Sequence, residues 1–287
     1  PPMVSLFESA GPNGTIAFSA AGGGSCTLAY ILYQPLDGPT AAAPPAPPPT
    51  ASESTVDVAD AAQLVGALRN LAAARSEGTA VVRLAAGATF NCSGSEWPFD
   101  LANVLASVVV EGQGGSVLDG GGQRSLFHVS VPRANLTLQS VAVRNVRPLI
   151  CEESEDASGE GACDGGAVLV SDGLLVLDRC RFQSSEAPGG TRGGAVAVHG
   201  GEARIVGCEF EQLRADVGGA LFVRAGDVAV SGTVFRANNA TSGGAVAAIG
   251  VGGAAARPSF DNCSFEANAA QESGGALYTH DSGSFDV

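Results

Sequence analysis

The sequence predicts an all-β fold, a parallel β-helix in which successive coils stack along one axis. Three observations predict it. A Gly-Gly-Ala-Val/Leu tetrad recurs with a period in the twenties, a phenylalanine recurs between successive tetrads, and this part of the chain has no helical patterning. Glycine supplies 40 of 287 residues and aromatic residues only 6%, a composition that favours many turns and thin layers over one thick core.

Each tetrad is expected to start one coil. The first glycines, at separations of 28, 25, 25 and 31 residues, are Gly165, Gly193, Gly218, Gly243 and Gly274. The intervening phenylalanines, at separations of 28, 25 and 30 residues, are Phe182, Phe210, Phe235 and Phe265. Two interleaved markers that share one period indicate a β-solenoid, in which each repeat buries its apolar face against the next.

Aligning the tetrads predicts which side chains face the interior, because residues two apart in a strand share a face. The fourth position gives the row Val168, Val196, Leu221, Val246 and Leu277. The position two residues later gives Val170, Val198, Val223, Ala248 and Thr279. Two residues before each phenylalanine lie the small residues Cys180, Cys208, Thr233 and Cys263, which would let the rings stack. The paired glycines fit a tight corner that needs positive φ or leaves no room for a side chain.

The chain before the tetrads divides into parts of different composition. Residues 1–38 carry short alternating stretches and are expected to form a short β segment or the end of a preceding domain. Residues 39–55 are a Pro/Ala/Ser/Thr-rich linker of the polyproline II type. Residues 56–287 are assigned to the β-helix, which we expect to continue beyond residue 287 because the last coil ends before its phenylalanine element.

One helix is expected at about residues 60–75, where it would cap the apolar end of the stack. Leucines follow the i, i+3, i+4 pattern there, Asp57 or Asp60 can serve as N-cap, and Gly78 is expected to end the helix. Strands are expected at 80–84 and, in less regular coils, at 108–112, 117–120, 126–129, 136–138 and 141–143.

Charge and sequons indicate the compartment. The net charge of -14 opposes binding to a phosphate backbone, which excludes nucleic acid as a partner. No run of about 18 apolar residues occurs, so no membrane span is expected in this segment. The seven cysteines fit an oxidising, extracellular location, and because their number is odd, one is either unpaired or bonded outside this segment. Five sequons predict N-glycosylation at Asn13, Asn91, Asn135, Asn239 and Asn262.

The repeats resemble those of known families. The tetrads, with Phe235-Arg236-Ala237-Asn238 and Phe265-Glu266-Ala267-Asn268, resemble the GGAI and FxxN repeats of chlamydial polymorphic outer membrane proteins, although the coils of Phe182 and Phe210 lack the final Asn. The stretch from 109–112 through 126–129 resembles the start of pectin-lyase-like β-helices. The resemblance implies a right-handed β-helix. It does not imply one function, since adhesins, wall proteins and polysaccharide-cleaving enzymes share this fold.

The linker resembles the proline-rich segments of plant and green-algal wall glycoproteins. This resemblance implies hydroxylation and O-glycosylation of the central prolines, namely Pro44, Pro45, Pro47, Pro48 and Pro49.

Candidate catalytic carboxylates lie too far apart to cooperate. A polysaccharide lyase of this architecture would need clustered carboxylates and an arginine base, and a hydrolase two close carboxylates. The alignment places Asp172 and Asp281 four coils apart, roughly 19 Å at strand spacing. A lyase would depend on Asp172 or on Arg224, so loss of calcium-dependent polyuronate cleavage on changing either residue would reveal it.

The histidines and outward aromatic residues are interpreted as structural. His199 and His280 lie three coils apart, and His199 is expected to be an exposed turn residue rather than a catalytic partner of Arg224. His128 is expected at the surface or half-buried. Phe222 and Tyr278 share an outward column that could form an aromatic platform for glycans, with packing at the rim as the favoured interpretation.

The acidic insert at residues 151–163 is the most distinctive local feature. Its carboxylates at 152–160 could bind calcium, but the spacing does not match an EF-hand loop, and a solvated loop is favoured. A disulfide between Cys151 and Cys163 would pin its base. Cys26 could pair with Cys92. Cys180 and Cys208, in adjacent coils, could form a disulfide or a stacked column of buried thiols.

These observations together predict a non-catalytic structural or adhesive domain of a larger extracellular glycoprotein, in a cell-wall, cell-surface or ciliary-hair (mastigoneme-like) assembly. Its partners would be other extracellular glycoproteins or copies of itself, with glycans as further candidates, and no cofactor or catalytic residue is expected. The alternatives are a polysaccharide lyase or hydrolase and a carbohydrate-binding module.

Overall fold

The structure, a computed structural model, describes residues 53–75, 77–147, 164–185, 190–250, 256–281 and 283–286. These residues belong to one compact unit that begins at Pro49. The expected β segment at 1–38, most of the linker, and the insert at 151–163 lie outside the described residues, as do Asn13, Cys26 and the five linker prolines.

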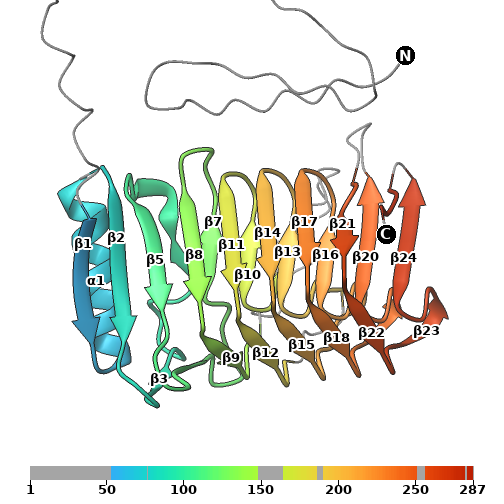
Figure 1. The fold of residues 1–287 in the computed structure, drawn as a ribbon, viewed down its shortest axis with the longest axis horizontal. Helices are drawn as coiled ribbons and strands as arrows, with labels where there is room; N and C mark the ends of the chain where they lie inside the picture. Colours follow the sequence, from blue (N-terminus) through green and yellow to red (C-terminus); the bar gives the residue numbers. More distant parts are fainter. Residues whose placement is uncertain are drawn as a thin grey trace, which may run out of the picture. The chain divides into compact units, whose positions relative to one another are not determined.

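The described chain is a parallel β-solenoid, as the repeats predicted (Figure 1). Every strand pairs in parallel with a strand one turn away. Sheet 1 has the order β1 (Glu53–Val58), β2 (Thr79–Leu84), β5 (Ser107–Glu111), β8 (Asn135–Gln139), β11 (Leu174–Asp178), β14 (Glu202–Val206), β17 (Asp227–Ser231), β21 (Ser259–Asp261). Sheet 2 runs β3 (Thr89–Asn91), β6 (Val117–Asp119), β9 (Ala142–Arg144), β12 (Arg181–Gln183), β15 (Glu209–Glu211), β18 (Val234–Arg236), β22 (Ser264–Glu266).

Sheet 3 runs β4 (Phe99–Asp100), β7 (Phe127–Val129), β10 (Val168–Val170), β13 (Val196–Val198), β16 (Leu221–Val223), β20 (Val246–Gly250), β24 (Leu277–Asp281). The chain visits sheets 1, 2 and 3 in that order and completes about seven turns. In the last two turns a further pair, β19 (Asn239–Ser242) and β23 (Ala269–Ser273), forms between sheets 2 and 3. A short 3₁₀ helix at Leu101–Asn103 follows β4.

The interior rows are those that the tetrad alignment predicted. Val168, Val196, Leu221, Val246 and Leu277 pair in register, and all are fully buried except Leu277, which packs partly buried on the last turn. The second row is buried as far as Ala248, whereas Thr279 is exposed because no turn covers it. The phenylalanine rings stack with centroids 4.9 to 5.0 Å apart along four consecutive turns.

Both glycines of the tetrad are required by the corner, each for a different reason. The first glycine has positive φ in every tetrad, for example 77° at Gly165 and 66° at Gly218. The second lies against the backbone of the next turn, and a Cβ on Gly219 would overlap the carbonyl oxygen of Gly244. A side chain is therefore excluded from this corner by strain at one position and by overlap at the other.

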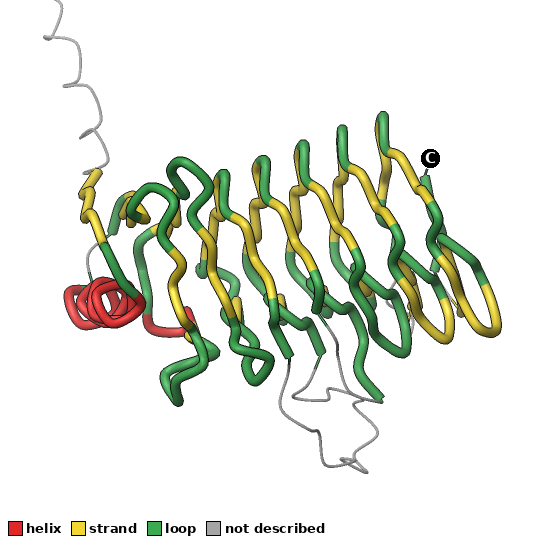
Figure 2. The backbone as a smooth tube through the Cα atoms, turned by 90° about the horizontal axis from the view of Figure 1, so that it is seen from below, coloured by secondary structure: helices red, strands yellow, loops and turns green. Residues whose placement is uncertain are grey.

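Helix α1 (Ala61–Ala74) lies at the end of the stack, as expected for a cap (Figure 2). Asp60 is its N-cap, with the side chain accepting from the Gln63 N–H. Its apolar side contributes Leu64 and Leu68 to the core. The expected range of about 60–75 is confirmed, but the left-handed residue that ends the helix is Arg75, with φ of 46°, rather than Gly78.

Two elements at this end differ from the expectation. Strand β1 starts at Glu53, inside the segment assigned to the linker, because its backbone pairs with β2 over six residues even though its side chains are mostly exposed. The expected strand at 80–84 is confirmed as β2, but it continues into β3 and β4, two short strands that the sequence did not indicate.

Candidate functional site

The outer face of sheet 3 carries the polar groups with the most specific geometry. Parallel, in-register pairing places outward residues of neighbouring turns side by side, so Asp100 lies beside His128 and His128 beside Leu169. The ladder continues past the strand ends, where the Ser171 N–H donates to the Val129 carbonyl. Polar side chains from three turns therefore meet at one edge of the sheet.

His128 connects a serine and a carboxylate. Its Nε2 lies 2.9 Å from the Ser171 Oγ, and its Nδ1 lies 3.4 Å from the Asp100 Oδ2. The other Asp100 oxygen accepts hydrogen bonds from the Ser130 hydroxyl at 2.6 Å and from the Ala102 N–H at 2.8 Å. The His128 side chain is half-buried, with 29% exposed, as the sequence predicted. These two hydrogen bonds orient the Asp100 carboxylate, whose other oxygen faces the imidazole.

A second histidine forms a buried cluster that the sequence did not indicate. His199 Nε2 lies 2.9 Å from Asp164 Oδ2, and the two side chains are only 4% and 3% exposed. The Arg192 N–H donates to the other Asp164 oxygen at 3.1 Å, and the Arg192 Nε lies 3.9 Å from Oδ2. The expectation that His199 is an exposed turn residue was therefore wrong, because residues 164 and 192 close over it from the neighbouring corners.

This cluster also covers Phe222. The Arg192 guanidinium lies 5.3 Å from the centroid of the Phe222 ring, and the His199 ring meets it edge-on at 6.0 Å. Phe222 is fully buried, whereas Tyr278 in the same column is half-buried beside His280. An exposed aromatic platform that includes Phe222 is therefore wrong, and packing at the rim, the favoured interpretation, is what the structure has.

The carboxylates considered for lyase or hydrolase chemistry stay apart. The register places Asp172 after β10 and Asp281 at the end of β24, four turns away. The Asp172 carboxylate accepts from the N–H of the next residue, Gly173, at 2.7 Å. Within the described ranges, no group of three or more His, Cys, Asp or Glu side chains is placed to hold a metal ion.

The described cysteines are free thiols. Cys180 and Cys208 stack in the predicted inward row, and the Cys180 N–H lies 3.4 Å from the Cys208 sulfur. Both are free thiols, so of the two alternatives the structure has the column of buried thiols and not the disulfide. A hydrogen bond to Cys180, reinforced by burial, raises the pKa of the Cys208 thiol. Cys92, the suggested partner of Cys26, is also free, and burial raises its pKa to about 12. The pairing of Cys151 with Cys163 lies outside the described residues.

The described sequons differ in exposure. Asn91 and Asn262 are exposed, each followed by a cysteine that faces the interior or lies half-buried. Asn135 and Asn239 are half-buried, and the Asn135 Nδ2 donates to the Ser107 hydroxyl at 3.2 Å. Asn91 and Asn262 are therefore the asparagines most open to modification among the described residues.

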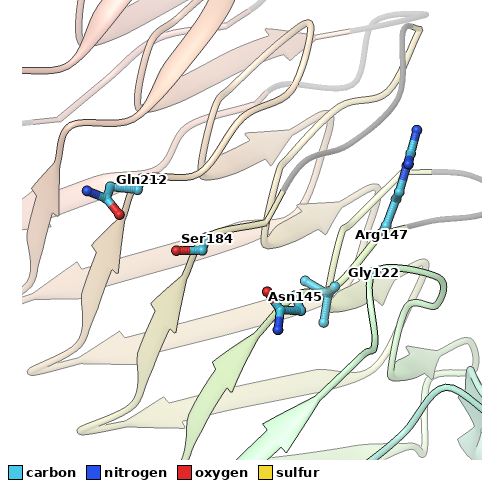
Figure 3. A pocket seen from close by; sticks show the side chains of 6 residues that line it. Gly122, Asn145, Arg147, Ser184 and Gln212 are labelled. Atoms are coloured by element: carbon cyan, nitrogen blue, oxygen red, sulfur yellow. The ribbon is translucent and has the colours of Figure 1, made fainter.

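A hollow of about 430 Å³ lies where the chain leaves sheet 2 (Figure 3). Asn145, Ser184 and Gln212 line it from three consecutive turns, all in the left-handed conformation with φ of 49°, 49° and 54°. Arg147 adds a charged group to the wall, and Gly122 and Val146 complete the lining. Amide, hydroxyl and guanidinium groups thus line one surface at the spacing of the turns.

Comparison of the chain with protein-family models, with curated proteins and with solved structures gave no match. The likeness of the tetrads to chlamydial and pectin-lyase-like repeats accordingly stays a prediction. Among the described residues, no helix is long and apolar enough to cross a membrane.

Proposed function

We propose that this chain is a structural or adhesive domain of an extracellular glycoprotein, working within a cell-wall, cell-surface or ciliary-hair assembly. The observation that carries the proposal is the uninterrupted interior, in which stacked side chains continue from turn to turn. Such a solenoid holds its outer faces at fixed positions and leaves them available for glycans and for partners.

The sequons support this proposal. Asn91 is exposed at the end of β3, and Asn262 is exposed between β21 and β22, several turns away. Two N-glycans could therefore be carried without disturbing the core. The partners we propose are other extracellular glycoproteins or copies of the same chain.

The test uses the full 287-residue chain secreted from a eukaryotic host. We expect glycopeptide mapping to find Asn91 and Asn262 occupied, and beads coated with the purified glycoprotein to cluster or to retain other secreted glycoproteins. An Asn91→Gln, Asn262→Gln double variant serves as the control for the glycans. A secreted chain without glycan at either site, on beads that neither cluster nor retain glycoproteins, would contradict the proposal.

A carbohydrate-binding module is the second candidate, and the hollow in Figure 3 favours it. Neighbouring turns lie about 4.8 Å apart, and the amide and hydroxyl groups of Asn145, Ser184 and Gln212 suit the hydroxyl groups of a sugar chain, while Arg147 suits a carboxylate. A glycan array that compares uronate-containing with neutral chains tests this. Arg147→Ala should abolish retention of acidic glycans, whereas Arg179→Ala, which removes an exposed arginine paired with Asp178, should not.

A further inference from the structure

We propose that Ser171 is an activated nucleophile and that Ser171, His128 and Asp100 form a hydrolytic site for carboxylic esters on the outer face of sheet 3. The proposal goes beyond the structural role and replaces the expectation that the domain has no catalytic residue. Among the described residues, the Ser171 hydroxyl is in hydrogen-bond contact with the His128 imidazole, and the Asp100 carboxylate lies 3.4 Å from the other imidazole nitrogen.

The fold explains why the three residues meet. Asp100 and His128 are directly paired on β4 and β7, and Ser171 follows β10, so each comes from a different turn. The Ser171 N–H donates to the Val129 carbonyl, which fixes the backbone beside His128. Sheet pairing therefore holds Asp100 and His128, and Ser171 lies directly after a paired strand; rigid elements hold a reactive geometry better than loops do.

The two contacts of His128 favour the imidazole tautomer that the chemistry needs. Asp100 Oδ2 lies 3.4 Å from Nδ1 and favours a proton on that nitrogen, which leaves Nε2, 2.9 Å from Ser171 Oγ, as the acceptor of the hydroxyl proton. Ser130 and the Ala102 N–H hold the carboxylate in place from its other oxygen. Asp100 is thus a positioning residue, while Ser171 and His128 are catalytic residues.

The reaction has two balanced halves. The Ser171 Oγ bonds to the ester carbonyl carbon and gives its proton to His128 Nε2, then the bond to the alcohol oxygen breaks and the alcohol leaves with that proton. A water molecule next attacks the acyl carbon and gives a proton to Nε2. The bond to Oγ breaks, the carboxylic acid leaves, and the proton returns to Ser171.

The cluster is accessible but not enclosed. Ser171 and His128 are half-buried, and the Asp100 side chain is 49% exposed. An open sheet face suits a small acyl group presented on an extended molecule, and we expect slow turnover with an acyl-enzyme that can be trapped.

The full chain is treated with a fluorophosphonate probe and separately with p-nitrophenyl acetate. We expect the probe on Ser171 by peptide mass mapping, and ester hydrolysis that falls by about 10²-fold or more in Ser171→Ala and in His128→Gln. Ser259→Ala is the matched control, because that hydroxyl donates only to a backbone carbonyl, Val228 O, at 3.4 Å. Equal rates in the wild type and Ser171→Ala, or no label on Ser171, overturn the proposal.

A comparison of kcat with KM separates positioning from a merely structural effect. In Asp100→Asn, kcat for p-nitrophenyl acetate should fall while KM and the thermal unfolding midpoint stay as in the wild type, because Asp100 orients the imidazole and does not touch the ester. An unchanged kcat in Asp100→Asn overturns the role of Asp100.

Discussion

The His199 imidazole and the Asp164 carboxylate form a hydrogen bond of 2.9 Å between two almost fully buried side chains. Asp164 also accepts from the Arg192 N–H, so one carboxylate holds together the corners of two turns. Removing it would leave both an imidazole and a backbone N–H without their acceptor inside the protein.

Asp164→Ala should therefore lower the free energy of unfolding by about 3–5 kcal/mol, the usual cost of removing one partner of a buried pair. Urea denaturation followed by circular dichroism measures this. Asp172→Ala is the control, because its carboxylate is half-buried and accepts only from the adjacent Gly173 N–H. A similar loss of unfolding free energy in the two variants would show that the buried Asp164–His199 pair stabilises the fold no more than a half-buried carboxylate does.

The tetrad corner predicts a contrast between two equivalent glycines. Gly219→Ala should lower the free energy of unfolding by at least about 3 kcal/mol, because the new Cβ would overlap the fixed carbonyl of Gly244. Gly275→Ala, on the last turn, would place its Cβ 4.0 Å from the Asn268 oxygen and should change stability by less than about 0.5 kcal/mol. Thermal denaturation of both variants decides the point, and equal midpoints would refute the close-approach explanation.

The phenylalanine stack predicts a dependence on position. Phe210 is fully buried between Phe182 and Phe235, so Phe210→Ala should cost about 3–5 kcal/mol. Phe265 is only partly buried on the last turn, and Phe265→Ala should cost clearly less. Chemical denaturation gives both values, and an equal cost would mean that stacking does not continue through the core as described.

Thiol reactivity should follow burial. Cys92, Cys180 and Cys208 are buried, whereas Cys263 is half-buried, so among these four described cysteines iodoacetamide should modify Cys263 first in the folded protein. The pKa of Cys92 is raised to about 12, so its thiolate stays scarce until strongly alkaline pH and its labelling should need unfolding. Site-by-site mass mapping against time measures this order. Early labelling of Cys92 at neutral pH would contradict the buried position.

The sequence was sufficient for the regular turns because their markers are local. The glycine tetrads mark the corner of each turn, and the number of residues between tetrad and phenylalanine indicates how the chain passes through sheets 1 and 2. The interior rows could therefore be predicted from these two markers. In the first turn the strand at 80–84 was predicted, but β3 and β4 were missed because they are only three and two residues long. Strand β1 was missed because backbone pairing rather than side-chain pattern holds it.

The polar clusters could not be predicted in the same way. Asp164 directly follows an acidic insert and looks like one more loop carboxylate, and its partner lies 35 residues away. Asp100 and His128 precede the tetrads, so the alignment that placed Ser171 did not include them. The sequence offered one signal, an aspartate at position 100, because aspartate is favoured as the residue that caps the start of a helix. In the structure Asp100 caps the short helix Leu101–Asn103 by accepting from the Ala102 N–H.

Parallel pairing in every sheet has a mechanical consequence. Hydrogen bonds between strands of adjacent turns run along the axis of the stack. A pulling force along that axis therefore acts in the direction of these bonds, and the successive layers of bonds carry it in series. Such a domain would stiffly resist bending and compression, yet under tension it would open one layer after another and lengthen by the contour of a whole turn each time. Such a stack would therefore extend in steps under load rather than break in a single event.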